Sequence, residues 1–165
     1  MKNVVNIRPM NPSEYPLLED FLYEAIFLPE GVAPPSRDII LLPELQLYIA
    51  DFGTQKVDIA FVAEVEKKIV GAAWSRIVND YGHIDDQTPS LSISLYSEYR
   101  NQGIGTKLFQ KLLDQLAEEG YEKASLSVQK ANYAAKMYLK MGFYVAKENE
   151  EDYVMVIDLN SANTH

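Results

Sequence analysis

The chain has 165 residues, of which 47% are hydrophobic and 24% are charged. This length suits one domain with a real core, and this balance excludes disordered, collagen-like and coiled-coil chains. We therefore expect a single domain over residues 1–160 and a frayed tail over 161–165. The formal net charge of −9, with no Lys/Arg cluster, argues against a nucleic-acid partner and favours the approach of a cationic substrate.

The residue types exclude several kinds of chemistry. The chain has no cysteine, which rules out disulfides and a cysteine nucleophile, and its two histidines, His83 and His165, are too few for a histidine-rich metal site. We therefore expect no metal. No apolar run approaches the roughly 20 residues of a membrane-spanning helix, and the N-terminus lacks the apolar stretch of a signal peptide. These features predict a cytoplasmic protein with no membrane partner.

The first half of the chain alternates between short elements and turns. Residues 4–8 alternate apolar and polar side chains, as a strand does. Asn11, Pro12 and Glu14 are typical of a helix start, and apolar residues at helical spacing follow them. Proline and glycine interrupt residues 28–43, which are either a surface connector or a lid on the substrate side. Further elements are expected at 43–51 (helix), 59–66 (strand) and 69–78 (strand).

The second half of the chain shows clearer periodicity. Residues 91–96 alternate leucine and isoleucine with serine, which predicts a strand, and residues 103–120 place their apolar side chains on one helical face. Because a hairpin lies in the middle and a strand pair at the end, we expect an α/β (α+β) fold with a mixed sheet and helices on both faces. The remaining elements are expected at 124–128 (strand), 132–141 (helix), 143–146 (strand) and 153–159 (strand).

A glycine-containing turn joins the strand at 91–96 to the helix at 103–120. The first N–H groups of a helix have no partner within it, and the helix dipole is positive there, so the main chain can hold a phosphate. Glycine lets the phosphate approach closely. The spacing does not match a P-loop, and the third glycine of the dinucleotide fingerprint is missing, which disfavours a nucleotide-binding domain. The turn contains Arg100, Asn101, Gln102, Gly103, Ile104, Gly105 and Thr106.

This turn resembles the acetyl-CoA motif of the GNAT superfamily of N-acetyltransferases, usually written Gln/Arg-x-x-Gly-x-Gly/Ala. The resemblance covers residues 91–143, with a weaker echo at 69–74. Two motifs in the family's order and at its separation support the assignment. The matching residues are Arg100, Gly103 and Gly105 in the turn, Leu126 and Val128 in the next strand, and Asn132, Tyr138, Gly142 and Phe143 after it.

The resemblance implies a mostly antiparallel sheet of about six to seven strands, with a splayed strand pair that binds acetyl-CoA. The main chain of Ile93 and Leu95 would pair with the pantetheine arm, and an N–H near Leu95 would polarise the thioester carbonyl. Arg100 would add charge at the pyrophosphate rim or be a solvated surface arginine. Asn132 would contact the cofactor arm or only cap its helix. The N–H groups expected on the pyrophosphate are those of Gln102, Gly103, Ile104, Gly105 and Thr106.

Tyr138 matches the tyrosine that serves as general acid in this family. The departing thiolate must take a proton, and a phenol with an ordinary pKa of about 10 is protonated at neutral pH. The implied reaction is direct attack of a neutral primary amine on the acetyl carbonyl, with both substrates bound. No acyl-enzyme is needed, which agrees with the absence of cysteine.

The sequence leaves the general base open. Some family branches carry an acid near the start of the cofactor strand, where this chain has Ser90, Ser92 and Ser94. An acyl-CoA-binding sensor or interaction module without catalysis is therefore kept as the alternative function. The candidates for the base are Glu64, His83, Asp85, Asp86 and water.

The amine acceptor, a small molecule or a peptide, is expected to bind at the parts that resemble the family least. These are the first helix, the proline-rich segment 28–43 and the residues around Tyr48, Trp74 and Tyr81. Fold does not specify the acceptor. Dimers are common in the family, so a homodimer is one further expectation.

Overall fold

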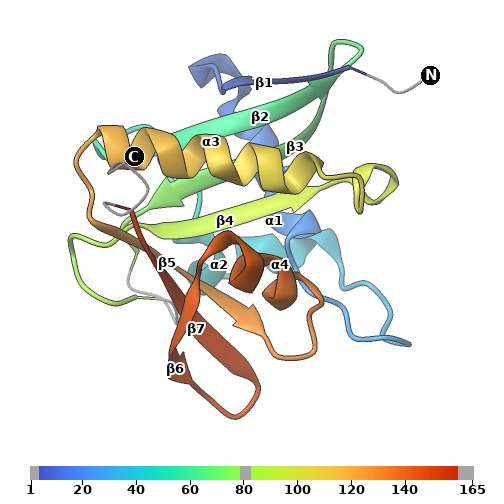
Figure 1. Cartoon of the computed structure of the whole chain (residues 1–165). Helices are drawn as coiled ribbons and strands as arrows, with labels where there is room; N and C mark the ends of the chain where they lie inside the picture. The colour runs from blue at the N-terminus through green and yellow to red at the C-terminus, as the bar shows by residue number, and fades with distance from the viewer. Residues whose placement is uncertain (1–3, 79–82, 160–165) are drawn as a thin grey trace.

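The computed structural model describes residues 4–78 and 83–159. Within them the strands form one seven-stranded sheet in the order β1-β2-β3-β4-β5-β7-β6 (Figure 1). Neighbouring strands are antiparallel except β4 and β5, which are parallel. This confirms the expected mixed, mostly antiparallel sheet. The strands are β1 (Val5–Pro9), β2 (Ile59–Val65), β3 (Lys68–Arg76), β4 (Ser90–Leu95), β5 (Lys123–Gln129), β6 (Tyr144–Glu148) and β7 (Asp152–Asp158).

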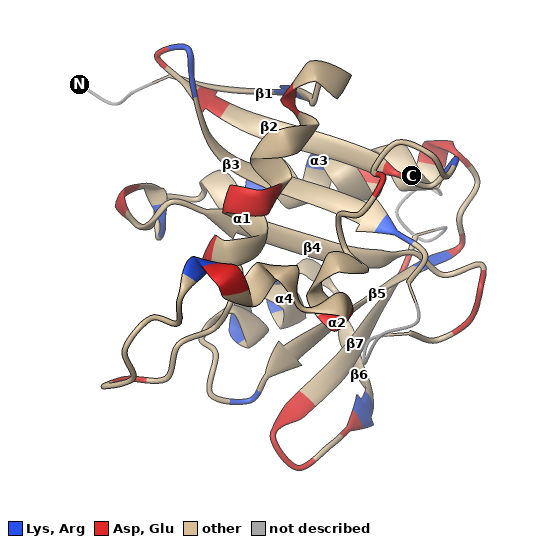
Figure 2. Ribbon diagram, turned by 180° about the vertical axis from the view of Figure 1, so that it is seen from behind, with Lys and Arg blue, Asp and Glu red and all other residues tan. Residues whose placement is uncertain are grey.

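Helices cover both faces of the sheet. The helices α3 (Ile104–Glu118) and α4 (Ala134–Met141) lie on one face, and α1 (Leu18–Glu24) and α2 (Pro43–Gln46) lie on the other (Figures 1 and 2). The larger core cluster joins α3 and α4 to the sheet, and a second cluster joins α1 to the opposite face of β2 and β3. The sheet therefore separates two apolar layers, as the expected fold requires.

The first helix begins later than the sequence predicts. Residues Pro12–Leu17 form a 3-10 helix, and the α-helical hydrogen-bond ladder starts only at Leu18. Pro16 lies inside this first segment and has no N–H to donate, so an α-helix cannot run through it from Pro12. The predicted acid at the helix start is in place, since Glu14 accepts a hydrogen bond from the N–H of Asn11 at 2.8 Å.

The predicted helix at 43–51 stops after its first turn. Buried Arg76, at the end of β3, donates to the carbonyls of Ala50 and Asp51, and Asp51 itself adopts the left-handed region with φ 54°. The same guanidinium meets both carboxylate oxygens of Asp58 at 3.1 Å. This buried ion pair fixes the chain between α2 and β2 as a series of turns.

The segment at 28–43, predicted as a connector or a lid, is partly ordered by its own contacts. It carries a 3-10 helix, Arg37–Leu41, whose Ile40 is buried in the second core cluster. The Tyr23 hydroxyl on α1 donates to the Pro35 carbonyl at 2.5 Å. The predicted frayed tail at 161–165 lies outside the described residues. Among the helices that are described, none has the length and apolar character needed to cross a bilayer.

Candidate active site

The parallel strands β4 and β5 diverge soon after they start. Their register contains one pair, Ser90 opposite Ser125, and the Ser125 N–H donates to the Pro89 carbonyl at 2.9 Å. Beyond this pair the two halves of the sheet separate, and α3 follows β4 through the short 3-10 turn Ser97–Tyr99. This is the splay that the sequence predicts.

The register of β4 on β3 decides which backbone groups face the divergence. The Tyr96 N–H donates to the Val70 carbonyl at 3.0 Å, and Leu95 lies opposite Gly71. In an antiparallel pair, hydrogen-bonded positions alternate with positions whose N–H and C=O point away from the partner strand. The main chain of Ile93 and Leu95 therefore points away from β3, toward the side on which β5 diverges.

The N-terminus of α3 supplies main-chain donors at the open end of β4. Gly103 is the N-cap residue with φ 81°, no side chain caps the helix, and the Lys107 N–H donates to the Gly103 carbonyl at 3.3 Å. A Cβ added at Gly103 would meet no atom within 4 Å. The open space and the uncapped N–H groups of residues 103–106 fit a pyrophosphate.

Arg100 contacts the ends of β4 and α1, and its predicted role at the pyrophosphate rim stays a prediction. Its Nε donates to the Leu95 carbonyl at 3.0 Å, and its Nη2 lies 3.3 Å from the Glu24 carbonyl and 3.4 Å from Glu24 Oε1. The side chain is half-exposed. Arg100 therefore links the end of β4 to the end of α1, and neither of its two predicted roles describes this link.

Two further predicted residues make local contacts. Gln102 donates through Nε2 to the Glu98 carbonyl at 2.8 Å, which braces the turn and leaves its main chain available. Asn132 Oδ1 accepts from the Ala134 N–H at 2.9 Å, so its side chain caps the start of α4. The capping alternative is present in the structure, and the contact with the cofactor arm stays a prediction.

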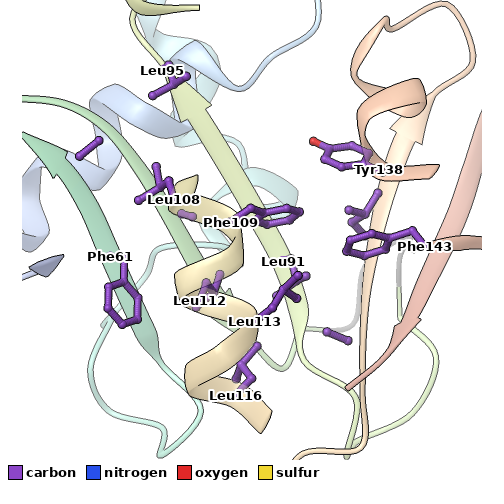
Figure 3. Packing of buried hydrophobic residues seen from close by; sticks show 14 of the residues in the cluster. Phe61, Leu91, Leu95, Leu108, Phe109, Leu112, Leu113, Leu116, Tyr138 and Phe143 are labelled. Carbon is purple, nitrogen blue, oxygen red and sulfur yellow. The ribbon is translucent and has the colours of Figure 1, made fainter. Parts of the chain in front are cut away.

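Tyr138 is buried on α4 and packs against two phenylalanines. Its ring centroid lies 5.6 Å from that of Phe109 on α3 and 5.7 Å from that of Phe143. Figure 3 shows the ring extending from α4 with its hydroxyl on the side of β4. No hydrogen bond joins this hydroxyl to the residues that the structure describes. Burial raises the pKa of Tyr138 to about 12, so the phenol keeps its proton at neutral pH.

The candidates for the general base lie at both ends of the central strands. Glu64 follows Ala63, which pairs with Gly71, the residue opposite Leu95. Glu64 accepts a hydrogen bond from Arg8 at 3.1 Å, within a triad that also contains Glu14. Asp85 accepts from Thr88 Oγ1 at 2.9 Å, just before the start of β4. Five strand steps separate Ser90 from Leu95, which places the two ends of β4 about 17 Å apart.

The other two candidates for the general base also lie near the start of β4. His83 and Asp86 precede β4 and form an ion pair at 3.5 Å if the imidazole is protonated. The predicted roles of these residues stay untested. A further carboxylate at the Leu95 end is Glu24, which the sequence analysis missed. Glu24 lies 76 positions from Arg100 in the sequence, so no local motif indicates that the two residues meet.

The residues predicted to line the acceptor site lie in different surroundings. Trp74 is 1% exposed and donates through Nε1 to the Tyr48 carbonyl at 3.1 Å, so it is a core residue and not a pocket lining. Tyr81 lies outside the described residues. Tyr96, directly after β4, packs on Phe21 of α1 with ring centroids 5.1 Å apart. Its place at the end of the predicted strand 91–96 was the signal that would have identified it.

Comparison with known proteins now decides the family. A sequence model described as the acetyltransferase (GNAT) family matches residues 23–143. The chain belongs to the acetyltransferase (GNAT) family. It is 32% identical over 115 residues to an N-alpha-acetyltransferase of Sulfurisphaera tokodaii, an alignment that covers 60% of this chain and 68% of that protein.

A second relative and a solved structure extend the family comparison. The chain is 32% identical over 84 residues to the probable N-acetyltransferase camello of Xenopus laevis, covering 50% of this chain and 37% of that protein. It therefore spans little more than a third of camello. The crystal structure of PaiA N-acetyltransferase from Thermoplasma acidophilum in complex with coenzyme A matches with TM-score 0.69 and 18% identity, covering 94% of this chain and 99% of that one. At that identity the match supports the GNAT fold.

Proposed function

We propose that this GNAT protein is an acetyl-CoA-dependent N-acetyltransferase that moves an acetyl group to a primary amine by direct attack in a ternary complex. The observation that carries the proposal is the meeting of three features where β4 and β5 diverge. These are the outward-facing main chain of Ile93 and Leu95, the uncapped N-terminus of α3, and the Tyr138 hydroxyl on the side of β4.

The backbone groups are matched to the parts of this substrate. An extended pantetheine arm can pair with the β4 main chain as an added strand would, because Ile93 presents its N–H and C=O there and Leu95 presents its N–H, while the Leu95 carbonyl accepts from Arg100. The N–H groups at the start of α3 would hold the pyrophosphate, and the positive φ of Gly103 brings them into the open. Acetyl-CoA itself supplies the activated acetyl group.

The side chain best placed to handle a proton is Tyr138. The departing thiolate needs a proton as the tetrahedral adduct collapses, and a phenol that burial keeps protonated can donate one. A main-chain N–H near Leu95 would stabilise the oxyanion that forms on the thioester carbonyl. Holding both substrates at one place replaces the bimolecular encounter, which supplies much of the acceleration without a covalent intermediate.

The acceptor is proposed to approach from the α1 side of the sheet. Acidic residues lie along α1, as Figure 2 shows, and the whole chain has a net charge of −9. Both favour a cationic amine over an anionic one. The archaeal relative is named an N-alpha-acetyltransferase, which supports including a peptide N-terminus among the acceptors to be tested.

The test is calorimetric binding of acetyl-CoA followed by an acetyl-transfer assay against a polyamine, a free amino acid, an aminoglycoside and a peptide with a free N-terminus. The same peptide with a blocked N-terminus, and ATP and NAD in the binding assay, are the controls. Binding with turnover of one amine class supports the proposal. Binding without turnover on any acceptor favours the sensor alternative, and absence of acetyl-CoA binding contradicts both.

A further inference from the structure

Three oxygen atoms from two residues, Leu95 and Glu24, meet at the Arg100 guanidinium. Nε lies 3.0 Å from the Leu95 carbonyl oxygen, and Nη2 lies 3.3 Å and 3.4 Å from the main-chain and carboxylate oxygens of Glu24. Leu95 is the last residue of β4, and Glu24 is the last residue of α1. One side chain thus joins the cofactor-facing strand to the helix on the opposite face of the sheet.

The contact with Leu95 completes the anchoring of one peptide unit. The Leu95 carbonyl and the Tyr96 N–H belong to the same peptide group, and that N–H donates to the Val70 carbonyl on β3 at 3.0 Å. Arg100 holds the carbonyl at the other side. Because the peptide group is planar, two bonds on opposite sides fix its rotation. The Leu95 N–H lies in the preceding peptide group, which shares the Leu95 Cα with this fixed one.

The contact with Glu24 fixes α1 as well. The last carbonyls of a helix have no partner within it, and a cation there is favoured by the helix dipole. Two other contacts attach α1 to this strand end: Ser94 Oγ donates to the Phe21 carbonyl at 2.6 Å, and the Phe21 ring packs on Tyr96. Arg100 adds a charged contact at the helix terminus itself.

We propose that Arg100 is a positioning residue that acts through the Leu95 main chain and α1, and that charge on the pyrophosphate is not its role. The inference rests on the proposed function, because the groups it positions are the thioester-facing backbone and the acceptor-side helix. Removing its donors loosens both, so turnover suffers even with a thioester that has no pyrophosphate.

The test compares acetyl-CoA with S-acetylpantetheine, which lacks the pyrophosphate and the nucleotide. Arg100→Met removes every donor at similar length, and Arg100→Gln keeps one donor but no charge. We expect Arg100→Met to lower kcat/KM about 10-fold or more for both thioesters, since hydrogen bonds from a charged group are lost. We expect Arg100→Gln to recover part of that loss on both.

A role on the pyrophosphate predicts the opposite pattern. Arg100→Met and Arg100→Gln would then be equally impaired with acetyl-CoA, and both would match wild type with S-acetylpantetheine. That result would overturn the inference and leave the proposed function standing. Because the two thioesters are compared within one folded variant, a general loss of stability does not produce this pattern.

Two further variants complete the design. Glu24→Gln removes the carboxylate charge, and we expect Arg100→Met to cost less in that background, because one of its contacts is already weakened. Lys111→Gln, on the exposed face of α3, removes one positive charge and should leave the ratio of the two thioesters unchanged. If wild type binds neither acetyl-CoA nor S-acetylpantetheine, the proposed function and the inference are both wrong.

Discussion

Gly71 on β3 lies directly opposite Leu95 on β4, and a Cβ at position 71 would come within 2.1 Å of Leu95 Cδ2. The pair is one of the non-hydrogen-bonded positions of the antiparallel ladder, where facing side chains lie closest. The absence of a side chain at Gly71 therefore makes room for Leu95, whose own side chain is buried in the core. The two residues together determine how close β4 lies to β3 at the site.

Gly71→Ala is expected to destabilise the protein by about 1–3 kcal/mol, because the core must move to accept the methyl group. The Ser94 carbonyl, 3.1 Å from the new Cβ, restricts the movement. Urea denaturation measures the loss. Gly105→Ala is the control, since its Cβ would sit 3.6 Å from Leu95 Cδ1, an ordinary contact. Equal stability of the two variants would contradict the packing argument.

Tyr138→Phe is expected to reduce kcat about 100-fold or more while acetyl-CoA binding and the melting temperature stay near those of wild type. The ring contacts with Phe109 and Phe143 are kept, and no hydrogen bond to the described residues is lost. Steady-state kinetics and calorimetry on the same preparation measure the split. A large fall in stability or in acetyl-CoA affinity would show that the hydroxyl has a structural role instead.

The raised pKa of Tyr138 predicts the alkaline behaviour of the protein. Because burial lifts the folded-state pKa from 10 to about 12, kcat/KM should rise as the acceptor amine loses its proton and show no descending limb near pH 10. The folded state holds the proton more tightly than the unfolded state between these values, so the contribution of Tyr138 to stability is constant below pH 10 and is lost as pH rises toward 12. A fall in activity with an apparent pKa of 10 would contradict the assignment.

The Glu14 carboxylate predicts the acid limit of stability. Hydrogen bonds from Arg8 at 2.8 and 2.9 Å, opposed by desolvation and supported by the Asn11 N–H, lower its pKa to about 2. Its contribution is therefore present above pH 4.5 and is lost as pH falls toward 2. Glu14→Gln should cost about 1–3 kcal/mol at pH 7 and progressively less below pH 4.5.

Urea denaturation of wild type and Glu14→Gln at pH 7 and pH 3 measures this difference. Glu44→Gln, which removes an exposed carboxylate from α2, is the matched control and should change stability little at either pH. A stability difference for Glu14→Gln that is the same at both pH values would show that the carboxylate charge does not matter.

The periodicity of the sequence predicted an element correctly where that element's own residues determine its structure. The leucines of α3, the alternating residues of β4 and the glycine at 103 predicted the strand, the turn and the helix at which we propose that the cofactor binds. It failed where a distant group competed. Buried Arg76 takes carbonyls after α2, which no pattern in that segment reveals, whereas Pro16, which delays α1, was visible in the sequence.

The sequence by itself predicted the family, the mixed sheet and the turn proposed to bind phosphate, because the motif behind each prediction consists of residues close together in the chain. Only the tertiary structure decided which backbone groups of β4 face the divergence, that Trp74 is core, and that Arg100 contacts Leu95 and Glu24. Strand register and contacts across 76 positions depend on how distant elements pack. Alternation within one strand predicts which residues share a face, but the hydrogen-bonding partner is set by the neighbouring strand.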